Sequence, residues 1–233
     1  MALPVLETPK YKMTIPTTKQ EVEFRPFLVK EEKLLLLAQE SNDIVEITNV
    51  MIELVNACTF EKIDIAKLTT VDLEYAFLQL RAKSVGEVIK TQIKCEECGE
   101  FNEVEFDVRD IKIIYPEPVD NKVEIQDGVG LILKPFTVQD SKKIKDDNIV
   151  DNITTFLISA IETVWTNDEL IEFKQCSPEE QNIFIDSLPH DAMEKIQEYL
   201  DSQPRMSHTI KFKCVHCGHE NEVEVSGLAG FFG

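Results

Sequence analysis

Two Cys-x-x-Cys-Gly motifs, which we call knuckles, constrain the fold of this chain more strongly than any other feature of its sequence. They occupy residues 95–99 and 214–218 of the 233 residues. The two-residue gap lets both thiolates of a knuckle face one tetrahedral ion, and the glycine permits a turn that directs backbone amides toward the sulfur atoms. One knuckle supplies two ligands, whereas a closed structural zinc site needs four. We therefore expect one zinc ribbon, with structural zinc as the cofactor, whose ligands are Cys95, Cys98, Cys214 and Cys217.

Three other uses of paired cysteines are less compatible with the surrounding residues. A thioredoxin-like redox pair requires a strand-to-helix setting, whereas both knuckles have the pattern of turns between strands. Catalytic zinc keeps an open position and commonly includes histidine. His216 and His219 flank Cys217, but the first knuckle has glutamates at the corresponding positions, so we expect exposed turn residues. A nucleic-acid-binding ribbon would have basic and aromatic neighbours, and acidic residues predominate here.

The knuckles belong to an internal repeat. Four landmarks recur in the same order: a basic-Pro-Phe-x-Val segment, a segment with helical apolar periodicity, a Ser/Thr-x-x-acid helix start, and a knuckle followed by Asn-Glu-Val-Glu. They begin at residues 25, 44, 69 and 95 in the first half and at residues 134, 149, 177 and 214 in the second. We interpret the chain as an α+β tandem duplication of a strand–helices–zinc-knuckle unit. Two unrelated segments that share turn chemistry remain the alternative.

This interpretation divides the chain into four regions. They are an extended N-terminal arm (1–20), a first repeat (21–120) with its knuckle at 95–98, a second repeat (121–226) with its knuckle at 214–217, and an apolar C-terminal tail (227–233). Proline and glycine gather near residues 116–130, where we expect the join. The apolar periodicity of the second helical segment predicts a helix over 149–164. The second repeat holds about ten additional residues before its knuckle, and the apolar spacing over 191–200 predicts an additional helix there.

Both termini have features of partner-binding segments. The arm contains three prolines and no helical period, so it is either disordered or extended along a neighbouring protein. The tail carries two adjacent phenylalanines between glycines, which seldom face water without a function. It either folds back onto the second knuckle or inserts into another subunit. We expect its partner-binding residues to be Leu228, Phe231 and Phe232.

The charge of the chain restricts its partners. Acidic residues outnumber basic ones by 43 to 24, which gives a formal net charge of −19 at pH 7. A surface this acidic repels phosphate backbones, so we expect no direct binding of nucleic acid. The longest aliphatic run, Leu34–Leu37, is too short to cross a bilayer, and no secretory signal pattern is visible at the N-terminus. We therefore expect no membrane association, and a reducing cytoplasm in which paired thiols bind metal before they form disulfides.

The sequence contains no recognisable catalytic constellation. It lacks a Gly-rich phosphate loop, a Gly-x-Ser-x-Gly elbow and a His-Glu-x-x-His motif. Cys58 falls on the apolar stripe of its predicted helix and is expected to be a buried, inert thiol. Cys176 has no histidine or acid at motif spacing, so nothing indicates a nucleophile. We expect a protein that is not an enzyme.

Several segments together are similar to one known family. They are the opening Met1-Ala2-Leu3-Pro4, the stretch Thr17-Thr18-Lys19, the block from Phe24 to Lys33, the knuckles with their acidic flanks, and the Phe-Phe end. In these features the chain resembles the baseplate hub and hub-assembly proteins of T-even-type contractile-tailed phages. The likeness is strongest over the first hundred or so residues and the second knuckle.

The resemblance implies a structural or assembly protein of the central hub of the tail baseplate. It implies other tail or baseplate proteins as partners, and a homo-oligomer is compatible with it. It also implies a location in the host cytoplasm during assembly, after which the protein either stays in the virion tail baseplate or, as an assembly factor, leaves it. A cytoplasmic zinc-ribbon adaptor that docks a protein partner outside any virion is the alternative function.

Overall fold

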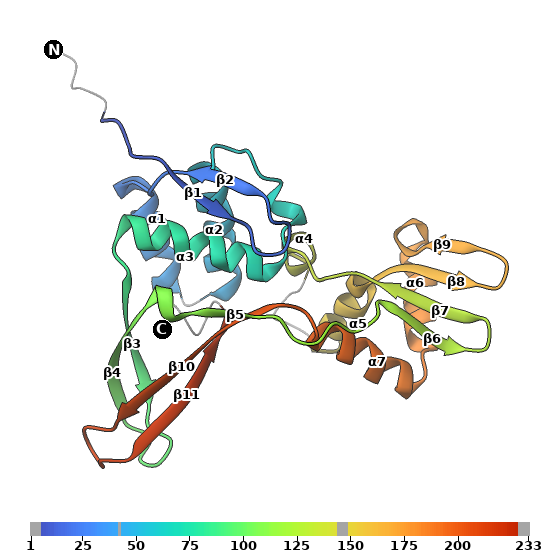
Figure 1. Cartoon of the computed structure of the whole chain (residues 1–233). Helices are drawn as coiled ribbons and strands as arrows, with labels where there is room; N and C mark the ends of the chain where they lie inside the picture. The colour runs from blue at the N-terminus through green and yellow to red at the C-terminus, as the bar shows by residue number, and fades with distance from the viewer. Residues whose placement is uncertain (1–5, 42, 144–148, 228–233) are drawn as a thin grey trace. The chain divides into compact units, whose positions relative to one another are not determined.

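The computed structural model describes residues 6–41, 43–143 and 149–227 and has an α+β fold (Figure 1). Its contacts divide the chain into two compact units. Unit 1 comprises Met1–Ile114 and Arg205–Gly233, and unit 2 comprises the intervening Tyr115–Pro204. Since the chain leaves unit 1 and later returns to it, segments from both ends of the sequence are packed together.

Unit 1 begins with a β-hairpin and three helices. In chain order these elements are β1 (Tyr11–Thr14), β2 (Glu21–Phe24), α1 (Val29–Ser41), α2 (Ile44–Cys58), the 3-10 helix η1 (Ile65–Lys67) and α3 (Thr70–Ser84). The Asp43 side chain caps α2 by accepting hydrogen bonds from the first-turn amides. The predicted apolar stripe of α2 is inside the unit, where Met51, Leu54 and Val55 are buried. Helix α2 contacts both α1 and α3 and is therefore central to this bundle.

Two long hairpins complete unit 1. One pairs β3 (Val88–Lys94) with β4 (Phe101–Asp107), and the other pairs β10 (Arg205–Lys213) with β11 (Glu220–Ser226), all antiparallel. The 3-10 helix η2 (Val108–Asp110) leads to β5 (Lys112–Ile114), which adds to β10. Side chains from both hairpins and from α3 share a buried core that includes Leu78, Ile89, Phe106, Met206 and Ile210.

Unit 2 is an antiparallel sheet with helices packed beside it. The sheet has the strand order β6 (Lys122–Gln126), β7 (Val129–Leu133), β8 (Ile161–Thr166) and β9 (Leu170–Glu172). The helices are α4 (Val138–Ser141), α5 (Ile149–Ala160), the 3-10 helix η3 (Phe173–Gln175), α6 (Pro178–Asp186) and α7 (His190–Asp201). Sheet and helices enclose one core, to which Leu131, Leu133, Leu157, Ile161 and Ile196 contribute.

Several local predictions are confirmed. The predicted helix start at Thr69 is a full capping box with Asp72, and the start at Ser177 is a capping box with Glu180. Pro178 occupies the first turn of α6 as expected. The additional helix predicted over 191–200 is α7, and both knuckles join antiparallel strands.

The helix predicted over 149–164 is shorter than its periodicity indicates. Helix α5 ends at Ala160, and Ile161–Thr166 is the strand β8, which pairs with β7 on one side and β9 on the other. The residues of β8 are mainly β-branched or aromatic, and these favour a strand. Ile161 and Val164 are buried in a strand just as they would be in a helix, so apolar spacing alone does not separate the two.

The compact units differ from the expected regions. Unit 2 begins at Tyr115, close to the expected join, but β10 and β11 of the second repeat (121–226) pack in unit 1 with the first (21–120). Residues 11–20 are not an extended arm, since β1 pairs with β2 and Ile15 is buried. The expected partner-binding tail residues, Leu228, Phe231 and Phe232, lie outside the described residues. No helix in the described part of the chain has the length and apolar character that a membrane span requires.

Candidate metal centre

The two knuckles meet at the ends of the two long hairpins of unit 1 (Figure 1). A cluster of four thiols forms here, and its sulfur atoms all lie within 4.8 Å of one another. The four residues are Cys95, Cys98, Cys214 and Cys217. All four predicted ligands are therefore brought together within a single chain. The cluster joins two segments that are more than a hundred residues apart in sequence.

Two of the sulfur separations are close to those of a tetrahedral thiolate site. Cys95 Sγ lies 3.7 Å from Cys217 Sγ, and Cys98 Sγ lies 3.6 Å from Cys214 Sγ. Zinc–sulfur bonds of about 2.3 Å in a regular tetrahedron place sulfur atoms about 3.8 Å apart. Each of these close pairs contains one cysteine from each knuckle. The first cysteine of each knuckle is buried and the second is exposed.

The two knuckles have the same backbone hydrogen bonds. In the first knuckle, the Cys95 N–H donates to the Glu100 carbonyl at 2.9 Å, and the Gly99 N–H donates to the Cys95 carbonyl at 2.9 Å. The equivalent bonds of the second knuckle measure 2.8 and 3.0 Å. Gly99 has a φ of 75° and Gly218 a φ of 78°, a conformation that favours glycine. The glycine of each knuckle is therefore required by the turn itself.

A buried asparagine on β4 connects the first hairpin to the second knuckle. Asn102 is 3% exposed, and its Oδ1 accepts a hydrogen bond of 2.9 Å from the Val215 amide. Its Nδ2 donates to the Glu100 carbonyl at 3.0 Å and lies 3.5 Å from Cys214 Sγ. One side chain thus fixes its own knuckle, orients the opposite one and donates to a candidate ligand.

Asn221 on β11 makes the reciprocal connection. It is also 3% exposed, and its Oδ1 accepts a hydrogen bond of 2.9 Å from the Glu96 amide in the first knuckle. Its Nδ2 donates to the His219 carbonyl at 3.1 Å, and its side chain also bonds the Cys95 thiol. We call Asn102 and Asn221 the cross-knuckle asparagines. Sequence reasoning noted the Asn-Glu-Val-Glu identity that contains them but assigned them no role.

The pKa values of the clustered thiols are shifted in opposite directions. Backbone amides, first that of Cys217, together with Asn102, lower the pKa of Cys214 to about 6. The Glu100 amide lowers the pKa of Cys98, but desolvation and the adjacent thiols outweigh it and raise that pKa to about 12. Four thiolates this close cannot all be charged without a cation between them. The cluster therefore has the donor set of a metal site and requires a cation if all four thiols are to be charged.

His216, His219 and Cys58 have the predicted environments. His216 and His219 are exposed and do not belong to the thiol cluster. Cys58 is fully buried at the end of α2, and burial raises its pKa to about 11, which is the behaviour of an inert thiol. Cys176 is partly buried just before α6. The described residues contain no second group of three or more potential ligands with this proximity.

Comparison with known proteins identifies the family. The model of the T4 bacteriophage base plate protein family matches residues 8–233, nearly the whole chain. No curated protein and no solved structure matches it. Baseplate proteins are structural components of the virion tail and contact other tail or baseplate proteins. The match covers nearly the whole chain, including both hairpins of the thiol cluster, and the chain therefore belongs to the T4 bacteriophage base plate protein family.

Proposed function

We propose that this protein builds or assembles the central hub of the phage tail baseplate, acting through protein–protein contacts rather than catalysis. The observation that carries the proposal is the family match over residues 8–233. Assignment to the hub rests on the resemblance of the N-terminal block and the knuckles to hub proteins. The protein would act in the host cytoplasm during assembly. It would then either remain in the finished baseplate as a structural component or leave it as an assembly factor.

We propose zinc as the ion of the four-cysteine cluster, with a structural role. Four thiolates in a tetrahedron favour zinc or iron over harder cations. The absence of an open coordination position in such a set suits a structural rather than a catalytic ion. The ion would join β3–β4 to β10–β11 and so hold the two ends of the chain in unit 1. Structural zinc contributes on the order of ten kcal/mol in small finger peptides, so its loss should destabilise unit 1.

We also propose that the chain is a tandem duplication. Arg25 forms an ion pair of 2.7 Å with Glu31, and Lys134 forms one of 2.6 Å with Asp140. Both basic residues and both acids are separated by the same offset of 109, and each acid also accepts a hydrogen bond from a backbone amide at the start of the helix that contains it. These ion pairs, in each of which the acid is buried, accompany the capping boxes and the knuckle hydrogen bonds, which recur in the same order.

The cross-knuckle asparagines support the same proposal. Each accepts from the amide after the first cysteine of the opposite knuckle, at 2.9 Å in both cases. Such reciprocity is the pattern of an interface between two copies of one surface. The knuckles therefore resemble a symmetric dimer contact that has become internal to one chain.

The hub assignment is tested by locating the protein in infected cells. Phage lacking this chain should produce no complete baseplates, and supplying the wild-type chain in trans should restore them. Quantitative mass spectrometry of baseplate intermediates should find the chain associated with central rather than peripheral components. Normal baseplates without the chain, or association with a single partner outside any tail structure, would contradict the proposal and favour an adaptor.

A further inference from the structure

Unit 2 has an apolar groove between α5 and α7. Its hollow of about 500 Å³ is lined by both helices, with Ile153 and Phe156 from α5 and Met193 and Leu200 from α7. Ile153 is 50% exposed, although isoleucine is usually buried. The other three side chains are partly buried and form the floor of the groove. The groove thus offers apolar surface in the part of unit 2 that the structure describes.

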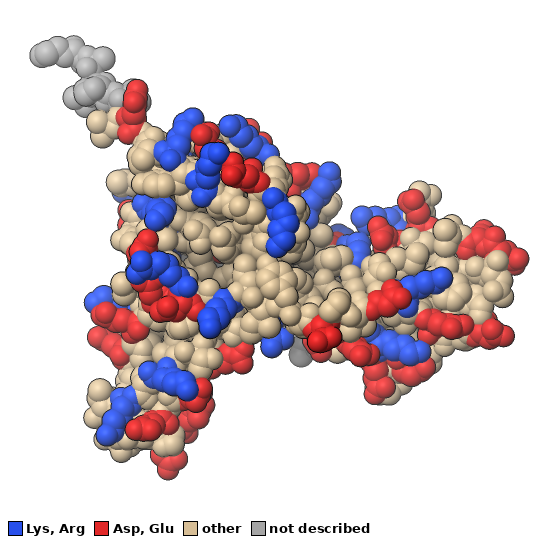
Figure 2. Space-filling view, viewed as in Figure 1, with Lys and Arg blue, Asp and Glu red and all other residues tan. Residues whose placement is uncertain are grey.

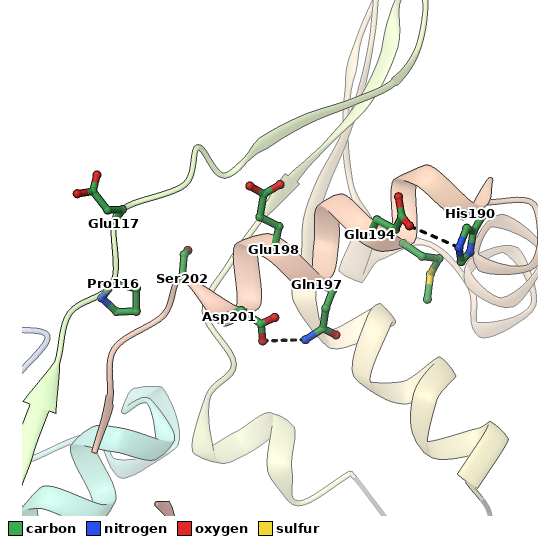
Figure 3. A pocket seen from close by; sticks show the side chains of 9 residues that line it. Pro116, Glu117, His190, Glu194, Gln197, Glu198, Asp201 and Ser202 are labelled. Carbon is green, nitrogen blue, oxygen red and sulfur yellow. Dashed lines mark hydrogen bonds and ion pairs between the residues drawn. The ribbon is translucent and has the colours of Figure 1, made fainter. Parts of the chain in front are cut away.

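An acidic stripe of α7 borders this groove. A second hollow, of about 800 Å³, is lined by Glu194, Glu198 and Asp201 from α7 and by Glu117 from the segment before β6. Figure 3 shows the carboxylates of Glu194 and Glu198 projecting from the same side of the helix. Met193 and Gln197 line both hollows, so the apolar floor and the acidic stripe are continuous.

The acidic stripe has little positive charge to balance it. Among the described residues that line the second hollow, none is Lys or Arg. His190 lies 3.6 Å from Glu194 and balances it only when protonated (Figure 3). The Lys195 ammonium donates to the Glu124 carbonyl at 2.9 Å and lies 3.9 Å from Asp191, an acid that lines neither hollow. Unit 2 as a whole has 19 acidic and 7 basic residues, so it holds −12 of the net charge of −19. Figure 2 shows Asp and Glu side chains spread over one face of this unit.

We infer that the α5–α7 groove binds a basic amphipathic helix of another baseplate protein. The apolar face of such a helix would lie on Ile153, Phe156 and Met193, and its Lys or Arg side chains would face the carboxylates of α7. Helix α7 spans 12 residues, so a partner helix of similar length would cover the groove. A second copy of unit 2 is a poor occupant because it carries the same negative charge.

The inference supplies a contact surface for the proposed function and rests on that function only for the identity of the partner as a baseplate protein. The test uses the purified full chain and a fluorescent helical peptide of about 14 residues, with leucine on one face and lysine on the other. A peptide of identical composition but scrambled order serves as the control probe. Fluorescence anisotropy at low ionic strength should give saturable binding of the amphipathic peptide and about tenfold weaker binding of the scrambled one.

Two matched triple variants separate the groove from general charge. In E194Q/E198Q/D201N the acidic stripe of α7 is neutral, whereas D168N/E169Q/E179Q removes the same charge from exposed positions of unit 2 outside the groove. The first should weaken binding of the amphipathic peptide about tenfold, and the second less than about twofold. Ile153→Lys should also weaken binding, while circular dichroism of each variant stays that of the wild type.

Equal weakening by both triple variants, or equal binding of both peptides, would overturn the inference. The same variants separate this outcome from a failure of the proposed function. If peptide binding is insensitive to the groove but the chain is present in purified baseplates, the inference falls and the proposed function stands. If the peptide results are as expected but the chain is absent from baseplates and their intermediates, the groove stands as a binding surface and the proposed function falls.

Discussion

At the scale of single residues, the cross-knuckle asparagines explain how two distant hairpins form one site. A cysteine supplies a ligand atom, but it does not determine which other knuckle completes the site. Asn102 and Asn221 each connect one knuckle to the backbone of the other, and both are buried. Each also bonds a buried thiol, which stabilises its charged form. They are therefore positioning residues for the proposed metal site.

Asn102→Ala should weaken metal binding even though all four cysteines remain. The change leaves the Val215 amide without its acceptor and removes one of the two donors to the Glu100 carbonyl, and outer-shell changes of this kind cost about 10–100-fold in metal affinity. Competition with a chromophoric chelator measures the change. Asn221→Ala should have a similar effect because its contacts are reciprocal, whereas Asn182→Ala on the exposed side of α6 should have none. An unchanged affinity in both knuckle variants would refute this role.

Asp140 should make the stability of unit 2 depend on acid pH. Burial alone would raise the pKa of Asp140, but hydrogen bonds from Lys134, Thr137 and Lys143 outweigh burial and hold the pKa at about 2. An unfolded Asp has a pKa of about 3.9. The stabilisation is therefore complete above about pH 5 and is lost as the pH falls toward 2, a contribution of about 1–2 kcal/mol.

Chemical denaturation of the wild type and of Asp140→Asn at several pH values tests this prediction. The variant should be less stable at neutral pH, and its free energy of unfolding should fall by about 1–2 kcal/mol less than that of the wild type between about pH 5 and pH 2. Asp168→Asn, at an exposed position in the same unit, is the control. Parallel pH profiles for wild type and D140N would show that the Lys134–Asp140 pair has no such effect.

At the scale of elements, the sequence predicted best where local chemistry alone decides the structure. The capping boxes at Thr69 and Ser177, helix α2 and the turns of both knuckles depend on residues within a few positions of one another, and all are present. The four ligands also followed from their spacing, since a closed site needs two knuckles.

Prediction from the sequence failed where distant segments decide the structure. Ile161–Thr166 satisfies helical spacing, yet it is a strand because β7 and β9 supply hydrogen-bonding partners on both sides. The return of β10 and β11 to unit 1 depends on their packing with β5 and α3, which no local pattern encodes. The groove between α5 and α7 was not predicted for the same reason, because its two sides are distant in sequence.

The capping boxes at Thr69 and Ser177 should differ in their contribution to stability, although their sequences correspond. Asp72 is fully buried and accepts hydrogen bonds from the Thr69 side chain and from the Thr17 amide at 3.0 Å, so it connects α3 to the N-terminal hairpin. Glu180 is exposed and bonds only Ser177 among the described contacts. Asp72→Ala should therefore cost about 2–4 kcal/mol and Glu180→Ala about 1 kcal/mol.

Thermal unfolding of the two variants measures these costs. Hydrogen exchange, read separately for each unit, shows where the protection is lost. Loss of protection in D72A should include β1 and β2 as well as α3, whereas loss in E180A should remain within unit 2. Equal destabilisation by the two substitutions would mean that the Thr17 contact adds nothing to the cap.

At the scale of the whole molecule, the chain has two compact units and one proposed metal site that ties its ends together. Unit 2 is inserted between the two hairpins that supply the cysteines, so the ion would close a loop that contains the whole of unit 2. Removal of the ion should release β10–β11 from β3–β4 and leave the separate core of unit 2 intact. Hydrogen exchange after chelation should accordingly increase in the two long hairpins, β3–β4 and β10–β11, and remain unchanged in β6–β9.

The central claim is that cysteines from both ends of one chain bind a single structural zinc ion, and native mass spectrometry of the purified protein tests it most directly. The account predicts one zinc ion per monomeric chain, lost in both Cys98→Ser and Cys217→Ser and retained in the control Cys176→Ser, which lies outside the cluster. Two zinc ions per chain, zinc found only in oligomers, or full retention of zinc in one of the two knuckle variants would contradict it.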